Sequence, residues 1–573
     1  MRRGLLLALL LGIALLLRIH HLERWLPDLF EEAVPILKAR NFWGGEMGGF
    51  DFNPHFFHYP ALSFYIHFAF QAAVFSIGFL LRAVPSLETF RTLLETDWHS
   101  FALLGRGVTV LFDLCTILVA WLLGNRFGER IGPAMAALVA VNALHIRLAQ
   151  YIIVDIPLVF FILLSLLFLL DVQERGQPGD FLKTGLAIGL ATATKYTAAL
   201  LVVPLIFAAL STIERRRNWN DLLAKIALSL GTAGLTFFLL DPFILFDFGA
   251  FFDDFTYERI HMETGHFGQN AGTTSILFYA AELWKITGIV GLAAVVALIQ
   301  TIKERDARRG VLFLWIVIYL VVISTWQMRA DRYLLPVVAV ILLMGATAIF
   351  AMAARFRAPW RMGMAVVAGM LYLLPQGFAL EAHYAGVSAP DTRSQARVWF
   401  QGQVPPGSLV ALETYTIQPE ALNGYLDIRL HIDVVDPQRW SCFYDLGWYE
   451  NFDYIFISSF VYQRYLDRAD EFPVQVQFYR DLEVHWQVAK RFAAEGKSGP
   501  TIVAFRNPSA SRIDAEYNPE IYKNLAGAKP SSVLTLLRRL EKIFRIAGFE
   551  QKAVDVEMRI SFLEDLLKRA RNP

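Results

Sequence analysis

Long apolar stretches separated by short polar segments dominate the first two thirds of the chain. A helix needs about 20 mostly apolar residues to cross the hydrocarbon core of a bilayer. Eleven stretches approach or reach that length, several of them short: 4–18, 102–123, 131–150, 154–171, 182–195, 197–213, 223–242, 286–302, 311–326, 333–353 and 361–380. The pattern therefore predicts an α-helical polytopic membrane protein with about eleven transmembrane helices.

A further apolar segment, at 60–82, conflicts with this count. If it crossed the bilayer, every later basic loop would move to the opposite side of the membrane. The simpler interpretation is a juxtamembrane helix that dips into the outer leaflet, with both of its ends on the outer side. The alternative is an ordinary span followed by a compensating crossing near 83–101.

The charge of the loops predicts the orientation, because cytoplasmic loops are enriched in Lys and Arg. Four loops are basic: Arg126 with Arg130, 215–217, 303–309 and 355–361. With these loops in the cytoplasm, the N-terminus is cytoplasmic and the first apolar stretch is an uncleaved helix. The outer side then receives residues 19–101, 243–285, the turns near 151 and 327–332, and everything after 381.

The hydrophobic pattern changes after about residue 381. The sequence there predicts a helix, a turn at Pro405-Pro406-Gly407 and a strand, and two later runs, NFDYIFISSFVYQRY and GPTIVAFRNP, are β-rich. From about 530 the chain is helical and amphipathic, with a pattern that favours packing over membrane anchoring. We therefore predict a transmembrane domain at 1–380 and an extracytoplasmic α/β domain with a helical C-terminal tail at 381–573.

Composition supports a membrane protein and excludes other classes. Of the 573 residues, 55% are hydrophobic and 18% are charged, and the mean hydropathy is +0.42. The net charge of +1, without a long basic run, offers no surface for nucleic acid. Cys115 lies inside an apolar stretch and Cys442 far downstream, so no disulfide framework is predicted.

Ionisable residues at the outer ends of the apolar stretches are candidates for a functional site. Glu31 and Glu32 follow the first stretch, Asp155 lies at the start of another, and Lys195 interrupts an apolar run. A charge at such a depth is costly unless it has a partner or lines a cavity. For Asp155 three roles are open: binding an acceptor, pairing with Arg147 or stabilising a helix start.

Simpler roles are open for several of these groups. Glu31 could be a solvated residue at the membrane surface, and for Glu32 an orienting or helix-capping role is favoured over catalysis. Arg329 and Arg332, at a helix end, could extend their charged groups to the membrane surface.

Several sequence elements follow one another in a characteristic order within residues 5–380. They are the pair Glu31-Glu32, a His58-Tyr59-Pro60 element, a GNRFG turn, Asp155 at an outer mouth, a Thr194-Lys195-Tyr196 element and an RYLLP element at 332–336. This order resembles the GT-C superfamily of membrane glycosyltransferases, which use polyprenyl-phosphate sugar donors and include protein O-mannosyltransferases and lipid A aminoarabinose transferases. The first acid is Glu where many relatives have Asp, so the choice between Glu31 and Glu32 stays open.

The resemblance implies a transferase of the cell envelope, placed in the plasma (inner) membrane. It would move a monosaccharide from undecaprenyl or dolichyl phosphate to a glycan, lipid or protein acceptor at the outer face. A protonated alcohol is a poor nucleophile, so a base is needed, and Glu31 is the candidate, with Glu32 as the second acid. Charge accumulates on the leaving lipid phosphate, and Lys195, Arg329 and Arg332 are the candidate cations. One direct displacement would invert the anomeric carbon.

The same elements supply further candidate residues. Tyr196, beside the lysine of its element, joins the donor-binding set. Asp155, His58, Tyr59 and His261 are candidates for substrate binding, with aromatic packing as the alternative for His261.

No cofactor is expected. Asp51, His55 and His58 could bind a divalent cation, as carboxylates do in oligosaccharyltransferase relatives, but their spacing is not that of a tight ligand set.

The competing interpretation is a polytopic transporter or flippase for lipids or lipid-linked sugars. Such proteins also have many spans and a few buried charges, and they often show paired repeats. Neither repeats nor inverted halves are visible in this chain, and the charged candidates gather on one face. A sensor whose membrane part is only an anchor would not need eleven spans with internal Lys and Asp.

Overall fold

The computed structural model describes residues 2–30, 32–44, 49–212, 218–268, 274–417, 426–430, 441, 443–508, 530–546 and part of 550–564. Glu31 and Cys442 lie outside these residues. The chain divides into two compact units, the first formed by Met1–Glu263 with Thr273–Ala385 and the second by Thr264–Gly272 with Gly386–Pro573.

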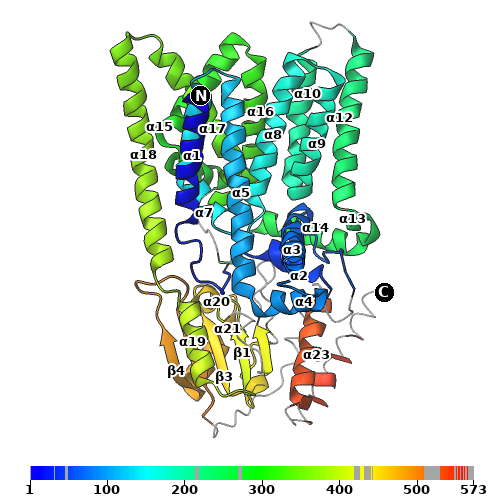
Figure 1. Cartoon of the computed structure of the whole chain (residues 1–573). Helices are drawn as coiled ribbons and strands as arrows, with labels where there is room; N and C mark the ends of the chain where they lie inside the picture. Colours follow the sequence, from blue (N-terminus) through cyan, green and yellow to red (C-terminus); the bar gives the residue numbers. More distant parts are fainter. Residues whose placement is uncertain are drawn as a thin grey trace. The chain divides into compact units, whose positions relative to one another are not determined.

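The first unit is a bundle of helices around one large apolar core (Figure 1). Its elements are α1 (Arg2–Ile19), α2 (Val34–Asn41), α3 (Leu62–Leu80), α4 (Leu87–Thr96), α5 (Trp98–Asn125), α6 (Ile131–Ala140), α7 (Ala143–Ala149), α8 (Asp155–Glu174), α9 (Pro178–Thr194), η1 (Tyr196–Leu201), α10 (Val202–Leu210), α12 (Trp219–Leu240), α13 (Phe243–Phe246), α14 (Phe248–Thr264), α15 (Ser275–Glu304), α16 (Ala307–Ser324), η2 (Asp331–Leu334), α17 (Leu335–Ala353) and α18 (Ala358–Ser388).

All eleven predicted apolar stretches coincide with helices or with pairs of helical segments. Among the described residues, eight helices are long and apolar enough to cross a membrane, or up to nine if the bent pair α6–α7 is one span. Three predicted spans are not among them. The helix α1 carries three arginines in 18 residues, α9 has only 17 residues, and the apolar segment formed by η1 and α10 is shorter still.

For α3, length and placement disagree. By length and composition it qualifies as a span, whereas the loop charges predict a juxtamembrane helix. Figure 1 shows α3 along its own axis, while α5, α8 and α12 run along the bundle. A helix that lies crosswise to the bundle follows the membrane plane, which supports the juxtamembrane interpretation.

Small residues allow α9 and α12 to pack closely. Gly185 and Gly189 are four residues apart and therefore lie on one face of α9. A Cβ atom on Gly185 would lie 2.3 Å from the backbone oxygen of Ser229, and one on Gly189 would lie 2.7 Å from that of Ala233. This contact follows the small-xxx-small pattern of membrane helices.

The helices that carry the candidate residues are interrupted. The α-helix α9 ends before Lys195, whose backbone is extended, and the chain continues as the 3₁₀ turn η1. In the same way Ala330 is extended, η2 follows, and α17 begins with Pro336 in its first turn. Each interruption places a cationic residue at the end of an apolar helix.

The second unit is built on a five-stranded sheet with the order β2-β1-β3-β5-β4. Strand β1 pairs in parallel with β2 and β3, whereas β5 pairs antiparallel with β3 and β4. The elements are α19 (Thr392–Gln403), β1 (Leu409–Glu413), β2 (Leu426–Leu430), η5 (Leu446–Tyr449), β3 (Tyr454–Ser458), α20 (Ser459–Leu466), α21 (Pro473–His485), β4 (Gln487–Phe492), β5 (Ile502–Arg506) and α23 (Pro530–Ile546).

The sheet has an apolar core on each face. Along β1, Leu409 and Ala411 belong to one core, whereas Val410 and Leu412 belong to the other. The predicted helix, turn and strand are α19, the Pro405–Gly407 region and β1, and the two β-rich runs contain β3 and β5. Buried residues of α23 join the first core, which supports packing as the role of the tail. The predicted small α/β domain is therefore confirmed as a fold.

The close contact of α9 with α12 predicts the effect of enlarging Gly185. Gly185→Val should lower the stability of the bundle by about 1–3 kcal/mol, because the added atoms meet backbone that cannot move away. Gly231→Ala, on α12, is the matched control, since its Cβ would meet no atom within 4 Å in the described part of the chain. Thermal unfolding in detergent measures both variants, and equal melting temperatures would contradict this packing.

Candidate active site

Glu32 is fixed by a buried ion pair. Its Oε1 accepts a hydrogen bond from Nη2 of Arg106 at 2.5 Å, and its Oε2 accepts one from the backbone N–H of Ile152 at 2.7 Å. The side chains of Glu32 and Arg106 are 1% and 0% exposed. Both carboxylate oxygens are therefore engaged in holding the loop, which supports the orienting role for this acid.

Arg106 also holds the chain that precedes the acidic pair. Its Nη1 donates to the carbonyl oxygens of Leu22 at 2.6 Å and Arg24 at 2.9 Å. Arg106 of α5 therefore holds both ends of the loop that follows α1. Glu31 itself lies outside the described residues.

A second buried ion pair joins Asp155 and Lys195. Lys195 Nζ donates to Asp155 Oδ1 at 2.9 Å, and the side chains are 19% and 5% exposed, respectively. Asp155 therefore pairs with Lys195 across 40 residues of sequence, and the alternative partner, Arg147, instead pairs with Asp331. Because α9 ends before Lys195 and α8 begins at Asp155, both side chains lie at the same end of the bundle.

Arg332 and Tyr59 lie in the electrostatic surroundings of this pair. Arg332 interacts with the charges of Asp155 and with Tyr59. The centre of the Tyr333 ring lies 5.1 Å from Lys195 Nζ and 5.5 Å from the guanidinium carbon of Arg332, so both cations contact the same aromatic ring. Burial raises the pKa of the Tyr59 hydroxyl; the charge of Asp155 adds to this rise and that of Arg332 opposes it.

His58 and His261 meet at Glu258, a residue that the sequence analysis did not single out. His58 Nδ1 lies 3.5 Å and His261 Nδ1 3.6 Å from Glu258 Oε2. Burial raises the pKa of Glu258, but hydrogen bonds and charge from His261 and His58 outweigh it and bring the pKa down to about 2. Glu258 also interacts electrostatically with Tyr59, so this acidic group adjoins the cationic one.

The loop before α3 is anchored by two further carboxylates. Asp254 Oδ2 accepts from the backbone N–H of Phe57 at 2.9 Å, and Asp241 Oδ1 accepts from that of Ala61 at 2.6 Å. Burial raises the pKa of Asp241 to about 8, with the Ala61 hydrogen bond opposing the rise. These contacts bind both sides of the His58-Tyr59-Pro60 element.

Two predicted donor-binding residues are occupied by contacts within the protein. The Tyr196 hydroxyl donates to the carbonyl oxygen of Phe57 at 3.1 Å, which links η1 to the loop before α3. Arg329 is 8% exposed and its Nε donates to Ser275 Oγ at 3.1 Å. Arg329 is therefore buried, and the alternative of a charge extended to the membrane surface is wrong for this residue.

Asp51 and His55 form an exposed pair. Asp51 Oδ2 and His55 Nε2 are 2.9 Å apart, and the hydrogen bond from His55, together with its charge, lowers the pKa of Asp51. His58 instead belongs to the Glu258 group. Within the described ranges, no group of three or more His, Cys, Asp or Glu side chains has the arrangement of a metal site.

Sequence reasoning missed Arg106 and Glu258. Arg106 is a charged residue inside an apolar helix, and the same feature had marked Lys195 as a candidate. Glu258 lies three residues before His261 on α14, a spacing that puts both side chains on one face of the helix. Glu32 lies 74 residues before Arg106, and His58 lies far before Glu258 in the chain, so only the fold shows these two contacts.

The buried Arg106–Glu32 pair predicts a large and asymmetric effect on stability. Arg106→Leu leaves a carboxylate buried without its cation and should cost about 3–5 kcal/mol. The double variant Arg106→Leu/Glu32→Leu should recover part of this loss, because neither charge then remains. Thermal unfolding of the three proteins checks this, and a double variant less stable than Arg106→Leu would contradict it.

The depressed pKa of Glu258 predicts an acid-dependent loss of stability. A carboxyl whose folded pKa lies below its unfolded value of 4.5 contributes stability above that value, and the contribution falls as the pH drops toward about 2. Glu258→Gln should therefore be less stable than the wild type at pH 7, and the difference should shrink by pH 3. Melting temperatures between pH 3 and 7 measure it; a constant difference would contradict the assignment.

Residues 99–243 match the sequence model of the family described as dolichyl-phosphate-mannose-protein mannosyltransferase. The matched segment includes Arg106, Asp155 and Lys195. A search of curated proteins found no match.

Solved structures match over almost the whole chain. ArnT from Cupriavidus metallidurans in the apo state has 16% identity and a TM-score of 0.53, covering 90% of this chain and 100% of its own. ArnT bound to undecaprenyl phosphate has 16% identity and a TM-score of 0.52, covering 89% and 99%. The Archaeoglobus fulgidus oligosaccharyltransferase tethered to an acceptor peptide has 12% identity and a TM-score of 0.51, covering 90% and 74%. The chain therefore has the GT-C fold that these membrane proteins share.

Proposed function

We propose that this protein is a membrane glycosyltransferase that moves a monosaccharide from a polyprenyl-phosphate donor to an acceptor at the outer membrane face. The observation that carries the proposal is the group formed by Lys195, Arg332 and Asp155 at one end of the bundle. The loop that contains the acidic pair meets this end through the Glu32–Ile152 hydrogen bond, three residues before Asp155.

The charge of the group suits a lipid monophosphate. Lys195 and Arg332 supply two positive charges and Asp155 one negative charge, which leaves one positive charge in excess. A sugar linked to a lipid through one phosphate carries a single negative charge, whereas a diphosphate would need further cations or a metal ion. As the sugar leaves, the phosphate gains a second charge, which the same cations stabilise.

An apolar groove offers a site for the lipid chain. It has a volume of about 350 Å³ and is lined by α15 from Ala280 to Leu298, together with residues of α16 and α17. Tyr279, next to its start, interacts with Tyr333 and Arg329. The lining residues of α15 lie on both sides of its kink at Gly288. A polyprenyl chain in this groove would bring its phosphate end toward the cationic group.

The hydrogen bonds that Glu32 already accepts favour Glu31 as the base. Both oxygens of Glu32 are engaged by Arg106 and Ile152, so deprotonating an acceptor would cost a buried ion pair. The neighbouring acid stays the candidate that removes the proton from the acceptor as it attacks the anomeric carbon. A single displacement of this kind inverts the configuration.

The acceptor is proposed to bind beside the Glu258 group. His58 and His261 lie on Glu258, and the ring of Tyr257 lies 5.4 Å from that of His58, edge to face. Hydroxyl or amine groups of a glycan, lipid or peptide would find both donors and acceptors there. The likeness to an oligosaccharyltransferase tethered to an acceptor peptide and to ArnT bound to undecaprenyl phosphate supports both halves of the proposal.

The site is further proposed to work without a metal ion and to face the outside of the plasma (inner) membrane. The N-terminus would be cytoplasmic and the α/β domain extracytoplasmic, as the basic loops indicate.

Substitution of the cation and of the base should separate binding from turnover. Lys195→Ala should weaken the binding of a polyprenyl phosphate by about 10- to 100-fold, because a charge-assisted contact is lost. Glu31→Gln should leave binding unchanged and lower kcat by about 10²- to 10⁴-fold. Binding is measured by titration with the lipid phosphate, and turnover by sugar transfer.

Lys225→Ala is the matched control for the cation. Lys225 also pairs with an aspartate, at 2.6 Å, but lies near the start of α12, far from the end that carries Lys195. It should bind the lipid phosphate as the wild type does. Equal loss in both lysine variants would contradict the proposed phosphate site, and full turnover in Glu31→Gln would assign the base role to another acid.

A further inference from the structure

A break separates α6 from α7. The two helices are bent by 57° at residues 141–142, so carbonyl groups at the end of α6 lose their helical partners. Arg18, from α1, donates through its Nη1 to the oxygen of Ala140 at 2.9 Å. The oxygen of Val139 accepts from the backbone N–H of Asn142 at 3.3 Å and from Arg18 Nη2 at 3.5 Å. The guanidinium therefore stabilises the broken backbone inside the bundle.

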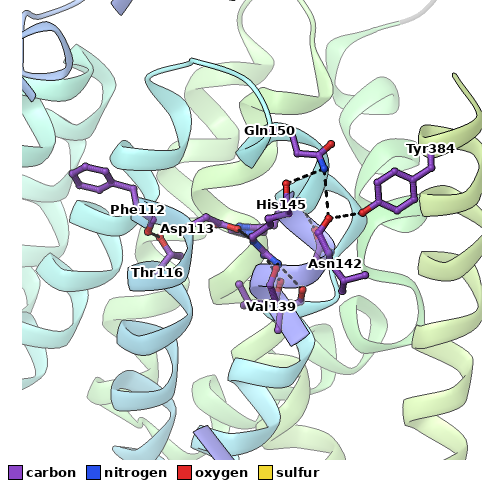
Figure 2. Close-up of polar contacts among 12 residues, drawn as sticks. Phe112, Asp113, Thr116, Val139, Asn142, His145, Gln150 and Tyr384 are labelled. Carbon is purple, nitrogen blue, oxygen red and sulfur yellow. Dashed lines mark hydrogen bonds and ion pairs between the residues drawn. The ribbon is translucent and has the colours of Figure 1, made fainter. Parts of the chain in front are cut away.

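Arg18 is itself held by a buried network, part of which is drawn in Figure 2. Its Nε donates to Asp113 Oδ2 at 2.5 Å, and His145 Nδ1 donates to Asp113 Oδ1 at 2.9 Å. All three side chains are fully buried. The network connects α1, α5, α6 and α7 at one point.

Asn142 fixes the direction in which α7 leaves the break. Its side chain accepts from the backbone N–H of His145 at 3.2 Å, which caps α7. Its Nδ2 donates to the Tyr372 hydroxyl at 3.0 Å and to the carbonyl oxygen of Ile286 at 3.3 Å. The short helix is therefore anchored on α15 and α18 as well.

Gln150, at the end of α7, connects this anchored helix to the loop after α1. Its Nε2 donates to the carbonyl oxygens of Arg18 at 3.0 Å and His20 at 2.7 Å. Its Oε1 accepts from Arg24 Nη1 at 3.3 Å and from His383 Nε2 at 2.9 Å. Gln150 is fully buried, and both ends of its amide are engaged.

The two residues that follow continue the contact with the same loop. The Arg24 guanidinium lies 4.3 Å from the centre of the Tyr151 ring. The backbone N–H of Ile152 donates to the Glu32 carboxylate, and the carbonyl oxygen of Ile152 accepts from the N–H of Ala33 at 3.2 Å. Residues 150–152 thus bind the loop on both sides of position 31.

The same stretch of chain also reaches the cationic group. Arg147, one turn before Gln150, pairs with Asp331, the neighbour of Arg332. Asp155, five residues after Gln150, pairs with Lys195. The segment 147–155 therefore contacts both the loop with the acidic pair and the group that we propose binds phosphate.

We propose that Gln150 is a positioning residue that sets the acid-bearing loop against the donor-binding cations. The inference rests on the proposed function, and it adds that the distance between base and donor is set by the segment 147–155. An error of about 1 Å in such a distance lowers turnover by up to about 10²-fold without a matching loss of binding. Gln150 touches neither donor nor acceptor in this account.

Gln150→Leu tests the proposal, with Gln173→Leu as the matched control. Gln173 is also buried, and its Nε2 donates to Ser211 Oγ at 3.2 Å and to the carbonyl oxygen of Ala307 at 2.9 Å, at the other end of α8. Gln150→Leu should lower kcat by about 10- to 100-fold and change the Kd for a polyprenyl phosphate by less than about threefold. Gln173→Leu should change neither.

Hydrogen exchange of the full-length protein gives a readout that does not depend on activity. Backbone amides within residues 20–30 should exchange about tenfold faster in Gln150→Leu, because the loop loses its hydrogen bonds to Gln150. In Gln173→Leu they should exchange as in the wild type. If the leucine variant does not fold, Gln150→Glu takes its place in the test. It keeps the side-chain acceptor but loses the donor, and it should also make these amides exchange faster.

Three results would overturn the proposal: unchanged exchange in the Gln150 variants, faster exchange with unchanged kcat, or an equal loss of kcat in Gln173→Leu. A wild-type protein that transfers no sugar from any donor would instead contradict the proposed function. The exchange data would still decide whether Gln150 holds the loop.

Discussion

A charge inside a membrane bundle is tolerated only when another charge or several hydrogen bonds compensate the loss of water. This constraint organises the helical unit, because its buried charges join segments that are far apart in sequence. The pairs are Arg18 with Asp113, Arg106 with Glu32, and Lys195 with Asp155. The first stabilises a broken helix, the second holds a loop, and the third lies where two helices end. Removing one partner from any of them would leave a buried charge with fewer compensating contacts, so the pairs act as fixed points of the structure.

The interruptions of the helices follow from the same physics. Backbone groups in lipid must find partners, so a helix can break only where protein groups replace the lost hydrogen bonds. Arg18 does this for the end of α6. The helix α9 ends before Lys195, and α17 begins only after η2, which contains Arg332. Both cationic residues therefore lie at helix ends, and the apolar helices themselves stay intact. The proposed phosphate site is formed by the cations at these helix ends, Lys195 and Arg332.

The sequence was most informative for features that depend on neighbouring residues, such as the length of an apolar helix. Within the described residues, all eleven apolar stretches coincide with helices or pairs of helical segments, because about 20 apolar residues are required wherever the chain crosses the bilayer; three of the stretches are too short or too charged to count as candidate spans. The sequence also singled out Lys195 and Asp155 as buried charges, but it left Arg147 as an alternative partner, since pairing depends on how distant helices pack. Glu258 was missed for the same reason: His58, which gives it its low pKa together with His261, lies 200 residues earlier in the chain. For α3, hydropathy and length favour a membrane span, whereas the loop charges and the crosswise direction of the helix in Figure 1 favour a juxtamembrane position.

The most direct test of the central claim is sugar transfer by the purified full-length protein. Radiolabelled monosaccharides on polyprenyl monophosphates and on the corresponding diphosphates would be offered with a native lipid extract as acceptor, with and without EDTA. The account predicts transfer from a monophosphate donor that persists in EDTA, because one excess positive charge at the Lys195–Arg332 group matches one phosphate. Transfer only from diphosphate donors, or transfer abolished by EDTA, would contradict it.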